Sequence, residues 1–146
     1  MSNDATNIWD VVPDWGGVGA RRLVRAPAGS LGGSIWELQP DASQFVYHFH
    51  HGSEELLIVL RGQPTVRMHD GDHKLQEGDV VPFPRGAAGG HQIRNDGAEV
   101  VRVLVVSTNA NPDVAEYPET GKVAPIVDGE HRFHRVADAV EHAGPE

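Results

Sequence analysis

Three histidines and one glutamate are the residues of this sequence whose types and spacing could do chemistry. His48 and His50 alternate within an aromatic-rich stretch, Glu55 follows closely, and His91 comes after a turn rich in proline and glycine. Alternate residues of a strand point to the same face, so His48 and His50 would project together. Neutral imidazoles with a carboxylate suit a divalent transition metal that keeps open coordination positions. The sequence therefore predicts a metal site.

Composition narrows the possible function classes. The chain has 146 residues, enough for one domain with its own core, and its net charge is −9. This acidic balance argues against nucleic acid or an anionic membrane as a partner, because no basic patch is present to neutralise phosphate groups. The absence of cysteine excludes a disulfide, a thiolate ligand and a cysteine nucleophile.

The sequence also predicts the compartment. Residues 1–20 include Asp4, Asp10 and Asp14 and lack an apolar run, which disfavours a signal peptide. No stretch reaches the length of a transmembrane helix. We therefore expect a cytoplasmic protein with no membrane partner.

The elements that would position the candidate ligands are short strands. From Arg22 onward, β-type runs alternate with glycine and proline turns, and helical periodicity is nearly absent. The expected strands are 34–38, 44–50, 55–60, 65–68, 80–83, 91–95 and 100–106. The last of these is nearly all apolar, as expected for a strand buried on both faces. Many short strands predict an all-β sandwich or barrel, and a small jelly roll fits best.

The sequence divides into a barrel with two irregular arms. The expected division is 1–24 as the N-terminal arm, 25–107 as the barrel and 108–146 as the C-terminal arm. We expect the first arm to pack through Trp9 and Trp15. The second should be irregular over 108–132, where prolines recur, and then form a short helix over 133–142 with an apolar face.

Strand periodicity also sorts the neighbours of the candidate ligands. Four apolar residues lie in phase with them: Val46, Leu57, Val59 and Ile93. They either line an apolar substrate pocket or pack in the core. Arg67 alternates out of phase with its neighbours and is expected to point outward, whereas Trp36, Tyr47 and Lys122 either contact a substrate or partner or simply pack.

Two motifs resemble those of the cupin family. The first is His48-Phe49-His50, four residues, Glu55, six residues, Gly62. The second is Gly78, five residues, Pro84-Arg85-Gly86, four residues, His91, three residues, Asn95. The resemblance implies a small double-stranded β-helix, that is, a jelly-roll barrel, with one divalent metal bound inside by four side chains: His48, His50, Glu55 and His91. Fe, Mn, Ni, Cu and Zn all accept such ligands.

The match departs from the family pattern in three places. Ala42 stands where a glycine is expected before the first motif. The loop between Gly86 and His91 is longer than usual, so it forms either a lid over the pocket or a wide turn. Glu54 and Glu55 are adjacent, and the spacing to the following glycine favours Glu55 as the ligand. Residues 116–122 also resemble the tail of bacterial single-domain cupins whose reactions are mostly unassigned.

The resemblance implies an enzyme that acts on a small molecule. A metal with open positions would polarise substrate oxygen atoms, or would bind dioxygen if it is iron, and Glu55 would be both ligand and general base. The lack of in-phase Arg and Lys disfavours phosphorylated sugars and favours a neutral or carboxylated chelating compound. Within this class we expect a dioxygenase, with isomerase, lyase or decarboxylase chemistry as alternatives.

Two alternatives in which the protein catalyses no reaction are also consistent with the sequence. The metal could anchor a small ligand in a binding or sensing module, or the barrel could have lost its metal and keep the histidines as core residues. Small cupins of this kind usually pair through a sheet edge, so we also expect a homodimer.

Overall fold

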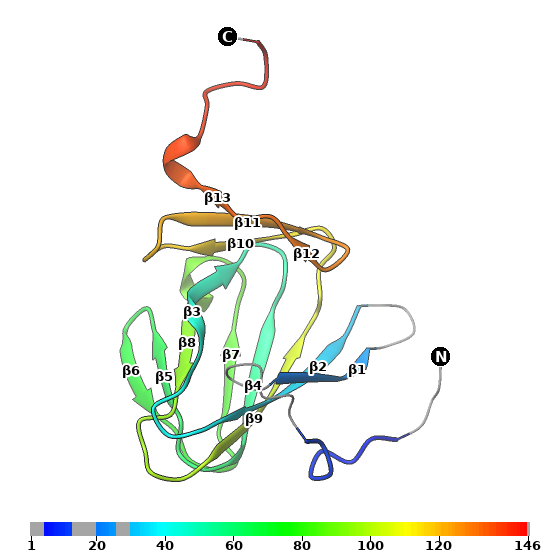
Figure 1. The fold of residues 1–146 in the computed structure, drawn as a ribbon, viewed down its shortest axis with the longest axis vertical. Coiled ribbons are helices and arrows are strands. Elements are labelled where there is room, and N and C mark those ends of the chain that lie inside the picture. The colour runs from blue at the N-terminus through cyan, green and yellow to red at the C-terminus, as the bar shows by residue number, and fades with distance from the viewer. Residues whose placement is uncertain (1–4, 13–19, 26–29, 146) are drawn as a thin grey trace.

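The protein folds into two antiparallel β-sheets packed as a jelly roll (Figure 1). The structure is a computed structural model that describes residues 5–12, 20–25 and 30–145. Its strands are β1 (Ala20–Arg25), β2 (Gly32–Leu38), β3 (Ser43–His50), β4 (Glu55–Arg61), β5 (Thr65–Met68), β6 (Gly71–Lys74), β7 (Val80–Phe83), β8 (His91–Arg94), β9 (Val101–Ser107), β10 (Asp113–Tyr117), β11 (Lys122–Val127), β12 (Glu130–His131) and β13 (His134–Arg135). The expected all-β jelly-roll class is confirmed.

The strand order places the candidate ligands between the sheets. One sheet has the order β1-β2-β9-β4-β7, and the other has the order β12-β11-β10-β3-β8-β5-β6 with β13 also paired to β11. The apolar residues that face inward from both sheets form one core: Leu38, Leu57, Val59, Val66, Phe83, Ile93, Val101, Val103 and Val105. Leu57, Val59 and Ile93 therefore pack in the core, and do not line a substrate pocket.

A distortion in β3 changes which side chain lies beside His48. The pairing of β3 with β8 shifts register between Gln44 and His48, and Phe45 has a φ of 45° in the left-handed region. Such an irregularity breaks the alternation of faces. Phe45 consequently packs edge-on against Trp36 with 4.9 Å between ring centroids, while Val46 is 42% exposed. The expectation that Val46 shares the face of the ligands is wrong.

The outer side of β9 is only partly covered. Val101, Val103 and Val105 are buried, whereas the residues between them are partly exposed, so the expected burial on both faces is wrong. The cover comes from the N-terminal segment 5–12, whose backbone is held by Arg102. Its guanidinium donates to the carbonyl oxygens of Ile8 at 2.9 Å and Val11 at 3.2 Å.

The expected packing of the N-terminal arm through its indoles finds no support. Trp9 is 58% exposed, and Trp15 lies outside the described residues. The region expected as an irregular arm also ends in a regular element, because β1 begins at Ala20.

The segment expected to be an irregular C-terminal arm forms strands instead. β10, β11 and β12 extend the second sheet, and β10 pairs directly with β3, with Ala115 opposite His50. The turn between β11 and β12 has Asp128 and Gly129 with φ of 51° and 81°, as a two-residue hairpin turn requires. The irregular assignment of 108–132 is therefore wrong.

The helix expected over 133–142 is absent as well. β13 and a single 3-10 turn, Val136–Asp138, occupy this stretch, and the chain then runs away from the sheets (Figure 1). Phe133 and Val140 are 58% and 67% exposed. A helix this short depends on burying its apolar face, and the apolar side chains of this segment stay largely exposed. Among the described residues, no helix is long and apolar enough to cross a membrane.

Candidate metal centre

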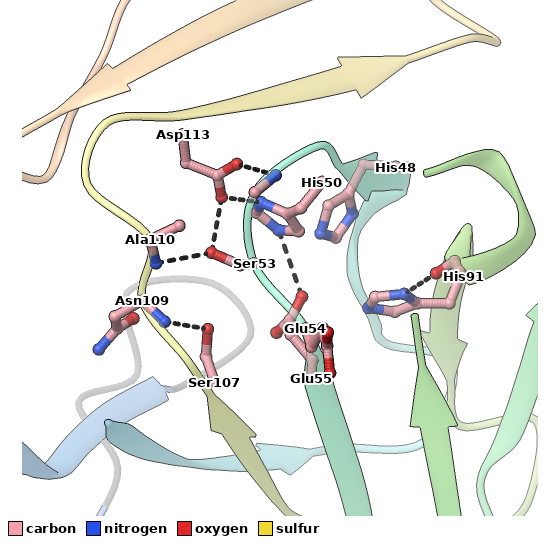
Figure 2. Close-up of polar contacts among 12 residues, drawn as sticks. His48, His50, Ser53, Glu54, Glu55, His91, Ser107, Asn109, Ala110 and Asp113 are labelled. Carbon is pink, nitrogen blue, oxygen red and sulfur yellow. Dashed lines mark hydrogen bonds and ion pairs between the residues drawn. The ribbon is translucent and has the colours of Figure 1, made fainter. Parts of the chain in front are cut away.

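The four candidate ligands come together from three strands. β3 supplies His48 and His50, β4 begins with Glu55, and β8 begins with His91, which is the cross-strand partner of His48. Potential ligand atoms of His48, His50 and Glu55 all lie within 4.8 Å of one another. His91 is outside that group, but its ring centroid is 4.9 Å from that of His48, and Figure 2 shows its ring directed toward the same space.

Backbone carbonyls fix the tautomer of two of these histidines. His48 Nδ1 lies 3.0 Å from the Val46 oxygen, and His91 Nδ1 lies 2.9 Å from the Gly89 oxygen. A carbonyl only accepts, so each Nδ1 carries a proton and the lone pair of a neutral ring remains on Nε2. Burial lowers the pKa of His48, and it lowers the pKa of His91 to about 4. Both rings are therefore neutral at pH 7, as metal ligation requires.

His50 lies between two carboxylates. Its Nδ1 is 2.9 Å from Asp113 Oδ2, and its Nε2 is 3.2 Å from Glu55 Oε1. Burial alone would lower the pKa of His50, but the two carboxylates outweigh this effect and raise it. Asp113 was not predicted from the sequence, because it lies on β10 in the segment expected to be irregular.

The carboxylate of Glu55 has an oxygen without a partner. Its Oε1 is buried and accepts no well-formed hydrogen bond within the described part of the chain, although His50 Nε2 is close. Burial would raise the pKa of Glu55, but the contact with His50 and the charges of the three histidines lower it overall. A buried, ionised oxygen beside three imidazoles is stabilised by a positive charge, which a bound cation would supply. The four side chains therefore fit a divalent metal.

The other polar residues of the first motif point to the surface. Glu54 is exposed and lies 3.6 Å from the Arg85 guanidinium, so the two adjacent carboxylates have opposite directions. His51 is half-exposed and pairs with Glu116 at 3.3 Å. Arg67, as expected, is outward and pairs with an exposed glutamate.

The remaining motif residues shape turns. Asn95 is buried and its Nδ2 donates to the carbonyl oxygens of Leu38 and Glu99 at 3.0 and 2.7 Å. Gly62 has a φ of 83°. The loop before His91 is a 3-10 turn, Ala87–Gly89, in which a side chain at Gly89 would collide with the backbone of Pro84. This loop is therefore a closely packed turn.

A cavity of about 950 Å³ opens beside the candidate ligands. Aromatic rings form much of its wall: Trp36, Phe45, Tyr117 and Phe133. The ring of Tyr117 stacks on His48 with 5.7 Å between centroids and an interplanar angle of 25°. Burial raises the pKa of Tyr117, so its hydroxyl is protonated at neutral pH. Among the side chains described around the cavity there is no lysine or arginine.

The comparisons with known proteins agree with this geometry. A proposed sugar phosphate isomerase from Acidithiobacillus ferrooxidans is 32% identical, with a TM-score of 0.71 over 79% of this chain and 73% of that chain. A cupin-superfamily sugar phosphate isomerase from Silicibacter pomeroyi is 24% identical, with a TM-score of 0.72 over 85% of this chain and 81% of that chain. A predicted oxalate decarboxylase from Thermotoga maritima is 25% identical, with a TM-score of 0.56 over 62% and 78% of the two chains.

No curated protein matches the chain significantly. The family model of the cupin domain matches residues 34–107, which span β2 to β9 and include all four candidate ligands. The chain belongs to the cupin domain family.

Proposed function

We propose that this protein is a metal-dependent enzyme that acts on a small substrate with chelating oxygen atoms. It would hold one divalent transition metal through four side chains: His48, His50, Glu55 and His91. The observation that supports this best is the buried oxygen of Glu55, which accepts no hydrogen bond from the described residues and faces imidazoles whose Nδ1 atoms already have protein partners. When bound, the metal supplies a Lewis acid for substrate oxygen and, if it is iron, a site for dioxygen.

The walls of the cavity favour a substrate with one polar end. Its oxygen atoms would lie at the end of the cavity where the ligands meet, and an apolar portion would face rings such as Trp36, Phe45 and Tyr117. The described lining offers no cationic side chain for a phosphate group. We therefore favour a neutral or carboxylated compound over a phosphorylated one.

The reaction we favour is isomerisation by proton transfer, with Glu55 as the base. The pKa of Glu55 is lowered, so its carboxylate is ionised and can accept a proton from the carbon beside a chelated carbonyl group. Glu55 then returns a proton, which can exchange with solvent in between, to the former carbonyl carbon, and the hydroxyl proton moves to the former carbonyl oxygen. Tyr117, whose hydroxyl stays protonated, is placed on the cavity wall to donate a hydrogen bond to a substrate oxygen. The relative that is 32% identical bears the name of a sugar phosphate isomerase, which supports the isomerase chemistry, whereas the lining of this cavity favours a substrate without phosphate.

Dioxygenation is the second candidate. Four protein ligands would leave up to two positions on a six-coordinate metal, which is enough for one substrate oxygen atom and dioxygen. The aromatic rings on the cavity wall also suit a substrate with an aromatic portion.

One experiment separates these functions. Protein loaded in turn with Mn²⁺, Fe²⁺, Ni²⁺ and Zn²⁺ is incubated with hydroxy-carbonyl compounds, with and without phosphate groups, in D₂O, while NMR follows exchange at carbon. Oxygen uptake is measured with Fe²⁺ protein and small chelating substrates. Carbon-bound exchange that Glu55→Gln abolishes and Glu54→Gln preserves would support isomerisation.

Other outcomes are equally informative. Oxygen uptake without exchange would support the dioxygenase. A tightly bound metal with neither activity, across both substrate sets, would contradict the enzyme and leave a metal-anchored binding module.

A further inference from the structure

We propose that Asp113 is a positioning residue of the metal centre, which orients His50 and fixes the tautomer of its ring. The proposal rests on the metal site of the proposed function. It assigns a role to β10, a strand that lies beyond the part of the chain matched by the family.

Four donors converge on this one carboxylate, and Figure 2 shows its contacts with His50 and Ser53. Asp113 Oδ2 accepts from His50 Nδ1 at 2.9 Å and from the Ser53 hydroxyl at 2.7 Å. Asp113 Oδ1 accepts from the backbone N–H groups of Gly52 at 2.8 Å and Val114 at 2.7 Å. Asp113 is 5% exposed, so these donors replace water almost completely. Only an ionised carboxylate has enough acceptor capacity for all four.

The arrangement makes His50 different from the other two histidines. In His48 and His91, Nδ1 donates a hydrogen bond to a backbone carbonyl oxygen, which is neutral and cannot be removed by a substitution. His50 Nδ1 donates instead to a negatively charged side chain. The carboxylate keeps the proton on Nδ1, so the lone pair of the ring is on Nε2, which lies toward Glu55. The negative charge also makes Nε2 a stronger electron-pair donor to a metal.

The same carboxylate joins β10 to the turn after β3. The Ser53 hydroxyl also accepts from the Ala110 N–H at 3.0 Å, and the His51 N–H donates to the Val114 oxygen at 2.8 Å. Gly52 fits tightly here, because a Cβ would lie 2.9 Å from both the Ala110 methyl and Asp113 Oδ1. Asp113 therefore orients His50 from a strand that packs closely behind its turn.

The test compares two variants that remove the same charge from the same cavity. Each oxygen of Asp113 accepts hydrogen bonds from two donors. In Asp113→Asn, the NH₂ group replaces one of these oxygens, so it faces two donors whichever way the amide is turned. In the control Asp128→Asn, the one hydrogen bond that the side chain accepts from a described residue comes from Asn111, and an amide oxygen can still accept it. Metal affinity is measured by competition with a chromogenic chelator for Co²⁺ and Zn²⁺. We expect Asp113→Asn to bind each metal roughly 10- to 100-fold more weakly, and Asp128→Asn within about twofold of wild type.

A second readout needs neither metal nor activity. Histidine side-chain ¹⁵N–¹H spectra of metal-free protein at pH 8.5 report the tautomer of each ring. We expect a protonated Nδ1 at His50 in wild type and its loss or exchange with Nε2 in Asp113→Asn. His48 and His91 should keep their tautomers in both proteins.

The outcomes separate this proposal from the proposed function. If Asp113→Asn keeps both the wild-type affinity and the Nδ1 proton of His50, Asp113 is not a positioning residue. If that variant does not fold, a wild-type spectrum without an Nδ1 proton at His50 would overturn the proposal by itself. If wild type binds no metal, the proposed function fails, and the tautomer comparison still decides the role of Asp113.

Discussion

At the scale of single residues, the candidate metal centre depends on His50, whose ring lies between Glu55 at 3.2 Å and Asp113 at 2.9 Å. The alternation of His48 and His50 and the spacing to Glu55 can be read along the chain. Asp113 cannot, because its partner His50 is distant in sequence and the contact depends on the pairing of β10 with β3. The direction of Glu55 was predicted from motif spacing, and the structure turns it inward and Glu54 outward.

The two adjacent glutamates give a matched pair of variants. Glu55→Ala removes a buried carboxylate that faces the imidazoles, so metal affinity should fall by at least about 100-fold. Glu54→Ala removes an exposed charge and should change affinity by less than about twofold. Isothermal titration with Zn²⁺ measures both. An equal loss of Zn²⁺ affinity in the two variants would show that the assignment of Glu55 as the ligand is wrong.

The histidine ligands allow a parallel test. His48→Ala and His91→Ala should each lose most bound metal, while far-UV circular dichroism still shows a folded β protein. His51→Ala, which changes a half-exposed neighbour, should keep the wild-type metal content by plasma mass spectrometry. Full metal content in either ligand variant would contradict the site.

Burial of His91 predicts a pH dependence in the metal-free protein. Its pKa is lowered from 6.5 to about 4 in the folded state. As pH falls below 6.5, the unfolded chain binds a proton at this residue that the folded chain does not. The free energy of unfolding should therefore decrease between pH 6.5 and 4, by at most about 3 kcal/mol from this group. Urea titrations at several pH values should show a smaller decrease in the free energy of unfolding for His91→Asn than for wild type. The same dependence on pH in both proteins would contradict the prediction.

At the scale of elements, strands with clear boundaries were predicted well. The expected strands 65–68 and 80–83 match β5 and β7 residue for residue, because turn residues bound both. β10 to β12 were missed because recurring prolines suggested an irregular path, although Asp128-Gly129 is a strong hairpin signal. The distortion of β3 was not predictable, because no glycine or proline marks it.

The hairpin turn between β11 and β12 offers a test at this scale. Gly129 has a φ of 81°, and nothing lies within 4 Å of a Cβ placed there. Gly129→Ala should therefore destabilise the fold by about 1 kcal/mol through backbone strain alone. Gly97→Ala is the control, since its nearest contact would be at 3.5 Å and its φ is not positive. Thermal unfolding should separate the two variants by a few degrees.

At the scale of the whole molecule, strands beyond the residues matched by the family model complete the cavity of the jelly roll. Tyr117 and Phe133 line the cavity but lie beyond the residues that the family matches. The sequence predicted the barrel because motif and strand pattern agreed. The pairing of β10 with β3 joins distant parts of the chain, and no local pattern specifies it.

The expectation of a homodimer stays a prediction. Apolar side chains such as Phe133, Val136 and Val140 are exposed on the C-terminal segment, as expected for residues that a second copy would cover. Light scattering at micromolar concentration should give twice the chain mass of 15.8 kDa. A mass of one chain under these conditions would contradict the prediction.

The position of Trp36 gives the cavity an optical reporter of its own. Its indole lies on the cavity wall against Phe45, whereas Trp9 is mostly exposed on the far N-terminal segment. The chain has three tryptophans, so replacing Trp9 and Trp15 with phenylalanine leaves Trp36 as the single fluorophore. Quenching of its emission by Cu²⁺ or Co²⁺, and a change in emission wavelength when a compound fills the cavity, would then allow ligands to be identified before any reaction is known.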